Sequence, residues 1–146
     1  MDEYYGLNLF GEKVDVGLKE PEEDQDLGEK EDKRFNIFLL TDAIGARDKR
    51  GAWVLYQKAL ASGMVADEIF WRVMWGIKAL ILSQKGKDAA ETGLNPFVYK
   101  KNKAFLKNWK TEELENLSEK LTLGYHDARR GIGDIDSLLE KTILSI

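Results

Sequence analysis

The chain has 146 residues, of which 43% are hydrophobic, and a formal net charge of −4. This length fits a single domain, and the absence of cysteine excludes both a disulfide framework and a thiolate zinc site. No apolar run approaches the roughly 18 residues that a membrane helix needs, and the first residues lack the basic and then apolar order of a secretory signal. We therefore expect a cytoplasmic protein with no membrane partner.

The charge is distributed unevenly along the chain. Residues 1–33 contain 12 Asp and Glu against 4 Lys, a net −8, whereas residues 34–146 contain 14 against 18 Lys and Arg, a net +4. Residues 20–33 include one Leu and no other large apolar side chain, so they cannot repay the entropy cost of folding. We predict an acidic, disordered tail at 1–33 and a helical domain at 34–146. The cluster YYGLNLF at 4–10 is an exception within the tail, and we expect it to dock on the domain or on another protein.

The domain begins with a short apolar helix that ends in a turn. Phe35, Phe38 and Leu39 fall on one face at spacings i, i+3 and i+4, Gly45 breaks the helix, and Asp48 is placed to cap the next one. The pattern predicts a second helix over residues 49–61, ended by a glycine at position 63. Its apolar stripe consists of Ala52, Leu55, Tyr56, Ala59 and Leu60.

The most apolar helix is expected at residues 67–83. One continuous face predicts burial in the core, and it carries Ile69, Phe70, Val73, Met74, Ile77, Leu80 and Ile81. A separate stripe of Trp71, Trp75 and Leu82 lies near the opposite side. A helix that is apolar on two sides is either buried between neighbours or presented to a partner.

Three further helical segments follow. A short turn capped by Asp88 is followed by Asn95-Pro96, which begins a helix to about residue 108 with Phe97, Val98, Ala104 and Phe105 facing inward. Thr111 is expected to cap the next helix, whose inward stripe is Leu114, Leu117, Leu121, Tyr125 and Ala128. The last helix covers about 134–145, with Ile135, Leu138, Leu139 and Ile143 facing inward. The sequence thus predicts an all-α, compact bundle of six to seven helices.

The residue types give little basis for catalysis. His126 is the only histidine, and Asp48, Asp88, Glu112 and Glu113 are accounted for by helix capping and the helix dipole. The glycines near residues 124–133 follow no strand and precede no Lys-Ser/Thr pair, so a phosphate loop is not indicated. We expect no catalytic site, no cofactor and no metal, and hence no enzyme activity by the chain itself.

Two features indicate binding. Lys100, Lys103, Lys107 and Lys110 project from one side of the helix that follows Asn95, in the outline of a helix-turn-helix whose second helix meets DNA phosphates. The alternative is an ordinary solvated face. Trp71 and Trp75 are of the residue type enriched in interface hot spots, although a bundle of this size also needs large core residues.

Three passages resemble the C-terminal, helical collar domain of the delta subunit of the bacterial DNA polymerase III clamp loader. The first is FNIFLLTDAIGARDKRGAWVLYQKAL at 35–60, with its "D-A-[small]-G-x-R-D" turn at 42–48. The second is EIFWRVMWGIKALILSQKG at 68–86, and the third is GLNPFVYKKNKAF at 93–105, similar to the family's "G-x-x-P-F-x-x-K-K" passage. The chain departs from the family at Trp75-Gly76, where the family often has Arg-Gln.

The resemblance implies a role in DNA replication as an assembly module that packs against the other clamp-loader subunits. It implies no ATPase activity and no nucleotide, and the 33 preceding residues leave no room for the family's ATPase-like, clamp-opening domain and its lid. We predict that the partner contacts involve Asp42, Arg47, Asp48, Trp71, Trp75 and Leu82. The alternatives are a small DNA-binding helical protein and a stand-alone interaction adaptor.

The tail adds a further candidate. Leu7, Leu9 and Phe10 lie in the sequence GLNLF, which is similar to the "Q-L-x-L-F" peptide by which many bacterial replication and repair proteins dock on the sliding clamp. Gly6 replaces the leading glutamine. An acidic, disordered tail suits such a peptide because its apolar side chains become buried on binding, so the sliding clamp is a second expected partner.

Overall fold

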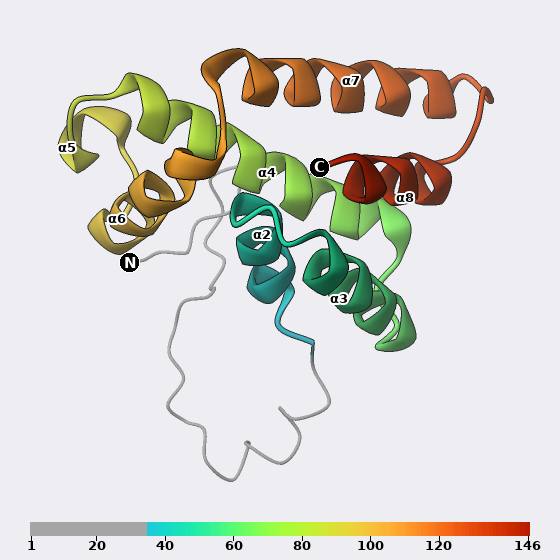
Figure 1. Cartoon of the computed structure of the whole chain (residues 1–146). Coiled ribbons are helices and arrows are strands. Elements are labelled where there is room, and N and C mark those ends of the chain that lie inside the picture. Colours follow the sequence, from blue (N-terminus) through green and yellow to red (C-terminus); the bar gives the residue numbers. More distant parts are fainter. Residues whose placement is uncertain (1–34) are drawn as a thin grey trace, which may run out of the picture. The chain divides into compact units, whose positions relative to one another are not determined.

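The computed structural model describes residues 35–146, which contain helices and no strand (Figure 1). The elements are α2 (Ile37–Gly45), α3 (Lys49–Ala61), α4 (Ala66–Lys85), α5 (Ala89–Thr92), α6 (Pro96–Phe105), the 3₁₀ turn η2 (Leu106–Asn108), α7 (Thr111–Arg129) and α8 (Ile135–Ser145). The predicted all-α bundle of six to seven helices is confirmed. Within the described part of the chain, no helix is both long and apolar enough to cross a membrane.

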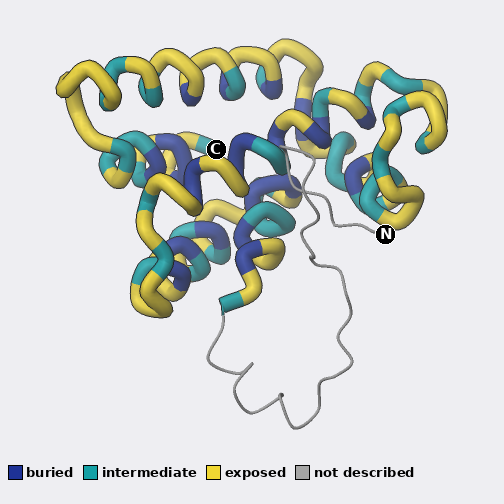
Figure 2. The backbone as a smooth tube through the Cα atoms, turned by 180° about the vertical axis from the view of Figure 1, so that it is seen from behind, coloured by how far each residue is buried: buried dark blue, intermediate teal, exposed yellow. Residues whose placement is uncertain are grey.

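Helix α4 lies at the centre of the bundle and contacts α2, α5, α6, α7 and α8. Its buried residues are Ile69, Phe70, Val73, Met74, Ile77, Ala79, Leu80 and Ser83. The predicted core face is therefore confirmed, apart from Ile81, which is half-buried. In the view from behind, exposed positions are found mainly on the outer helices and the connections, and buried ones where helices meet (Figure 2).

The buried residues of α2 are not those of the apolar face noted in the sequence. Ile37, Leu40 and Ile44 are buried, whereas Phe38 and Leu39 are about half exposed, at 49% each. Because the side chains of α2 are apolar on more than one face, periodicity alone does not choose between them. The packing of α2 on α3 and α4 selects the buried face, and the face that carries Phe38 is left towards solvent.

Helix α6 is also rotated relative to the prediction. Phe97 is 68% exposed and Ala104 is exposed, so their predicted inward positions are wrong. The buried residue of α6 is Asn102, whose Nδ2 donates a hydrogen bond of 3.3 Å to Oγ of the buried Ser83 on α4. This hydrogen bond satisfies the buried amide and joins α6 to α4.

The start of α7 falls one residue away from the expected cap. Thr111 is the first residue of the helix and Lys110 is its N-cap. The Lys110 backbone N–H donates a hydrogen bond of 2.8 Å to Oε1 of Glu113 in the first turn. This carboxylate, and not the Thr111 hydroxyl, therefore accepts a hydrogen bond from the backbone at the start of the helix. The predicted inward residues Leu114, Leu117 and Leu121 are confirmed as buried.

A buried tyrosine connects α3 and α8. Tyr56 is fully buried, and its hydroxyl donates a hydrogen bond to Oδ1 of Asp136. Burial, followed by the hydrogen bond to this carboxylate, raises the pKa of Tyr56 far above its ordinary value. The neutral phenol is therefore the form that the fold requires.

We predict that the Tyr56 pair makes the fold sensitive to alkali. The folded pKa exceeds the unfolded value of about 10, so the contribution of Tyr56 is complete below pH ~10 and is lost as the pH rises above it. Tyr56→Phe should lower the free energy of unfolding by about 1 kcal/mol at pH 7. Urea unfolding followed between pH 7 and 11 should show the difference between the two proteins shrinking above pH ~10. A constant difference would contradict this assignment.

Candidate functional site

The turn between α2 and α3 contains an unusual backbone conformation. The Arg47 N–H donates to the Ile44 carbonyl and the Asp48 N–H to the Ala43 carbonyl, both at 2.9 Å, which is a Schellman motif at the end of α2. The corresponding positions after α3 and α7 are Gly63 and Gly131, with φ of 103° and 87°. Arg47 takes the same left-handed conformation with φ 59°, although a side chain disfavours it. The contacts of its side chain therefore compensate for backbone strain.

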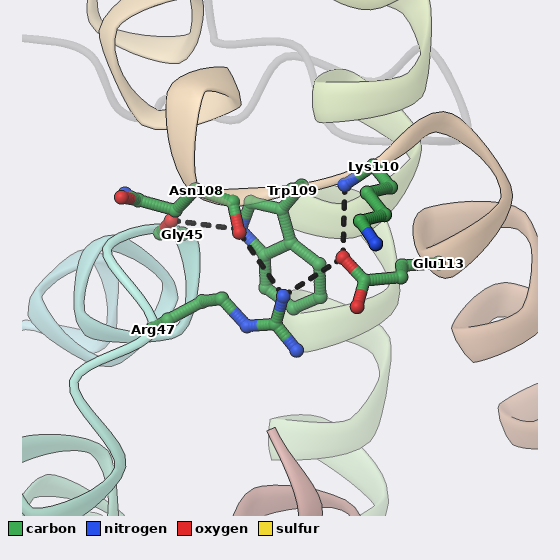
Figure 3. A network of polar contacts seen from close by, with 6 residues as sticks. All are labelled: Gly45, Arg47, Asn108, Trp109, Lys110 and Glu113. Atoms are coloured by element: carbon green, nitrogen blue, oxygen red, sulfur yellow. Dashed lines mark hydrogen bonds and ion pairs between the residues drawn. The ribbon is translucent and has the colours of Figure 1, made fainter.

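The Arg47 side chain reaches the connection between α6 and α7 (Figure 3). Its Nη1 donates 3.0 Å to the Asn108 carbonyl and lies 2.8 Å from Oε1 of Glu113. The guanidinium carbon lies 4.0 Å from the centroid of the Trp109 ring, within the range of a cation–π interaction. One side chain thus binds a carbonyl, a carboxylate and an aromatic face together.

Trp109 completes this network from the other side. It is 8% exposed, and its indole N–H donates 2.8 Å to the Gly45 carbonyl at the end of α2. A Cβ atom on Gly45 would lie 2.7 Å from Cδ2 of Phe105, so the glycine allows α2 and α6 to approach closely. We call Gly45, Arg47, Asn108, Trp109 and Glu113 the Arg47 clasp.

The carboxylate of the clasp is held in its ionised form. The Lys110 backbone N–H, together with the hydrogen bond and charge of Arg47, lowers the pKa of Glu113 below its ordinary value. Because Glu113 accepts both bonds through the same oxygen, Oε1, it joins the start of α7 to the end of α2. The clasp is therefore a charged, intramolecular junction.

The two aspartates of the predicted partner turn also make contacts within the chain. Asp42 forms an ion pair of 3.1 Å with Lys101 of α6. Asp48 caps α3 by accepting a hydrogen bond of 2.9 Å from the Gly51 N–H. The structure thus engages Asp42, Arg47 and Asp48 in separate contacts within the chain, and partner contacts through them stay a prediction.

The second predicted partner surface is a strip along α4. Trp71 is 39% exposed, Leu82 is 46% exposed and Trp75 is half-buried. The Trp71 ring meets the ring of Tyr125 on α7 edge-on, with centroids 5.0 Å apart. We call Trp71, Trp75 and Leu82 the α4 strip. It is an exposed apolar surface supported on one side by α7.

Of the remaining predicted residues, only Lys110 bonds to the clasp, through its backbone N–H to Glu113. Lys100, Lys103 and Lys107 are exposed on α6 and η2, and Lys110 is exposed at the start of α7. His126 is exposed on α7. Leu7, Leu9 and Phe10 lie outside the described residues.

Sequence reasoning did not find three of the contacting residues. Trp109 belongs to no periodic stripe, because it lies between η2 and α7, and Lys101 was one lysine among several. Asn102 is polar, so the sequence alone predicts that it is exposed. It is buried in the structure, where it donates a hydrogen bond to Ser83. The single available signal was a tryptophan directly before a helix start, since so large a side chain seldom stays in solvent.

Among residues 35–146, no group of three or more His, Asp or Glu side chains is placed to hold a metal ion. The two groups with a shifted pKa, Tyr56 and Glu113, are each accounted for by structural contacts that join helices. The arrangement offers surfaces for binding.

Comparison with known proteins gives no relative: no family model, no curated protein and no solved structure matches the chain.

Replacing Arg47 should separate backbone strain from side-chain contacts. Arg47→Ala removes the clasp contacts and keeps a strained residue, which should lower the free energy of unfolding by about 2 kcal/mol. Arg47→Gly removes the same contacts but relieves the strain, and it should be more stable than Arg47→Ala by about 1 kcal/mol. Chemical denaturation of both variants and the parent measures these differences. Equal stability of all three proteins would show that the clasp contributes nothing.

The lowered pKa of Glu113 predicts a dependence on acid. Because the folded pKa lies below the unfolded value of about 4.3, the carboxylate stabilises the fold above that pH, and the effect is lost as the pH falls through the folded pKa. Glu113→Gln should be less stable than the parent at pH 7, and the two should converge in acid. Thermal unfolding between pH 7 and 3 tests this, with Glu119→Gln on the exposed side of α7 as the control.

Proposed function

We propose that the chain acts as an assembly module in DNA replication, similar to the collar domain of the DNA polymerase III delta subunit. The supporting observation is that the three passages carrying the resemblance meet in one packed unit. The first passage forms α2 and α3, the second α4 and the third α6. The turn at 42–48 joins the first passage to the third through the Asp42–Lys101 ion pair and the close approach of Gly45 to Phe105. A role in binding, without catalysis, agrees with a bundle whose charged contacts serve to orient helices.

The α4 strip is the surface that we assign to the partner. An exposed tryptophan supported by a second aromatic ring, as in Trp71 against Tyr125, is of the kind that anchors interfaces. Leu82 lies three turns further along α4 and extends the strip. The partner is the helical domain of another clamp-loader subunit, whose apolar helix face would cover the strip.

The Arg47 clasp contributes to assembly indirectly. Its side chains are engaged within the chain, so a partner that used them would have to replace existing bonds. By holding the end of α2 against the connection between α6 and α7, the clasp fixes the helices on both sides of α4. It is a positioning element of the proposed interface.

Assembly can be tested by size-exclusion chromatography with light scattering. The full chain is measured alone and mixed with the ATPase subunit of its own organism's clamp loader. We expect a stable mixed complex, weakened at least tenfold by Leu82→Glu because a charge would be buried at the interface. Leu123→Glu, at an exposed leucine of α7, is the matched control and should leave the complex unchanged. Absence of a complex with the parent protein, or equal binding by Leu82→Glu, would reject the proposal.

A further inference from the structure

Positive charge is concentrated in one segment of an otherwise acidic chain. Residues 93–110 contain five lysines and no Asp or Glu, while the whole chain carries −4. These lysines are Lys100, Lys101, Lys103, Lys107 and Lys110. The segment forms α6, η2 and the N-cap of α7. The local charge therefore belongs to one continuous segment of the chain, α6 with η2 and the N-cap of α7.

Three of these lysines lie on the exposed side of α6 and η2. Lys100, Lys103 and Lys107 are spaced by three and four positions, so they lie on one side of a helix opposite the buried Asn102. Within residues 35–146, Lys101 pairs with Asp42, whereas no described carboxylate forms an ion pair with Lys100, Lys103 or Lys107. All three residues are exposed, and the Lys103 Nζ lies 5.6 Å from the centroid of the Tyr99 ring.

An aromatic ring lies on the same side. Phe97 is 68% exposed, the largest exposed fraction among the large apolar residues of the described chain. It precedes Lys100 and Lys101 by one helical turn, and the Lys101 Nζ lies 5.1 Å from the centroid of its ring. Ala104, two turns beyond Phe97, is exposed and small, so it does not obstruct the surface between Phe97 and Lys107. An exposed ring beside cations is the arrangement on which nucleic-acid bases stack.

We propose that the α6 face, defined as Phe97, Lys100, Lys103 and Lys107, binds single-stranded nucleic acid without sequence preference. Lysine ammonium groups contact phosphates as point charges and read no bases, and the Phe97 ring stacks on a base whose face is free only in a single strand. An acidic peptide would satisfy the lysines but has no flat group for the ring. The face extends about 15 Å from Phe97 to Lys107 at 1.5 Å per residue, which suits a few nucleotides.

This inference does not depend on the proposed assembly role. The α4 strip and the α6 face consist of different residues on different helices, so each can fail while the other holds.

The predicted salt dependence of nucleic-acid binding is modest. Three or four phosphate contacts on a single strand give a slope of about −2 to −3 in log K against log salt concentration.

Fluorescence anisotropy of a labelled oligothymidylate of 20 nucleotides, titrated with the full chain at low and moderate salt, tests the proposal. We expect binding that weakens with salt and that is tighter for the single strand than for a duplex of the same length. Unlabelled polyglutamate at equal charge should compete poorly, because it offers no base to Phe97. Absence of binding at low salt, or equal competition by polyglutamate, would overturn the inference.

Two pairs of variants locate the site. The triple change Lys100→Gln, Lys103→Gln and Lys107→Gln should reduce the salt slope by about 2. The control is Lys58→Gln, Lys120→Gln and Lys141→Gln, which removes the same charge from exposed positions on α3, α7 and α8 and should leave the slope unchanged.

Phe97→Ala should weaken single-strand binding about tenfold while the salt slope stays the same, because it removes stacking and no charge. Its control is Leu123→Ala, at an exposed apolar residue of α7. Circular dichroism establishes that each variant is folded. Equal losses in the lysine variant and its control, or no loss with Phe97→Ala, would mean that net charge alone attracts the oligonucleotide and would reject the α6 face.

Discussion

The contact of Arg47 with the Trp109 ring ties the end of α2 to the connection between α6 and α7. The clasp joins positions 61 to 66 residues apart in the chain, so it closes a long loop with three hydrogen bonds and one cation–π contact. A left-handed arginine is an unfavourable end for a helix, and glycine occupies the equivalent place after α3 and α7. The fold tolerates this strain because the guanidinium has three partners that glycine could not bind. Local strain is thus offset by tertiary contacts.

The same contact changes the interpretation of the turn at 42–48. In the sequence, the resemblance to the collar family predicts partner contacts by Asp42, Arg47 and Asp48 of this turn. In the structure its notable residues make contacts within the chain, since Asp42 pairs with Lys101, Gly45 admits Phe105, and Asp48 caps α3. The turn is mainly architectural. The exposed apolar and basic groups that remain for binding lie on α4 and α6.

The sequence predicts best what is decided locally. The caps Asp48, Asp88 and Asn95 and the core face of α4 follow from side-chain hydrogen bonds and from periodicity within single helices. On α6 the inward positions predicted for Phe97 and Ala104 are wrong, and on α2 Phe38 and Leu39 of the apolar face are about half exposed. Both helices have apolar residues on more than one side, and tertiary packing selects among them. The clasp was not predictable for a related reason. Trp109 lies outside any helix, and its partner Gly45 is 64 positions away.

The buried pair of Asn102 and Ser83 shows how a polar contact decides which surface a helix exposes. Apolar packing alone would favour burying Phe97, because exposing the ring costs more free energy than exposing Asn102 would gain. Burying Phe97 in its place would rotate α6 by about 140°, five residues at 100° each, and would separate Asn102 from Ser83, whose hydroxyl would keep its bond to the Ala79 carbonyl. The observed rotation keeps that pair and leaves Phe97 beside Lys100 and Lys101 in solvent. The exposed ring and the lysine row therefore lie on the side of α6 that is turned away from this buried pair.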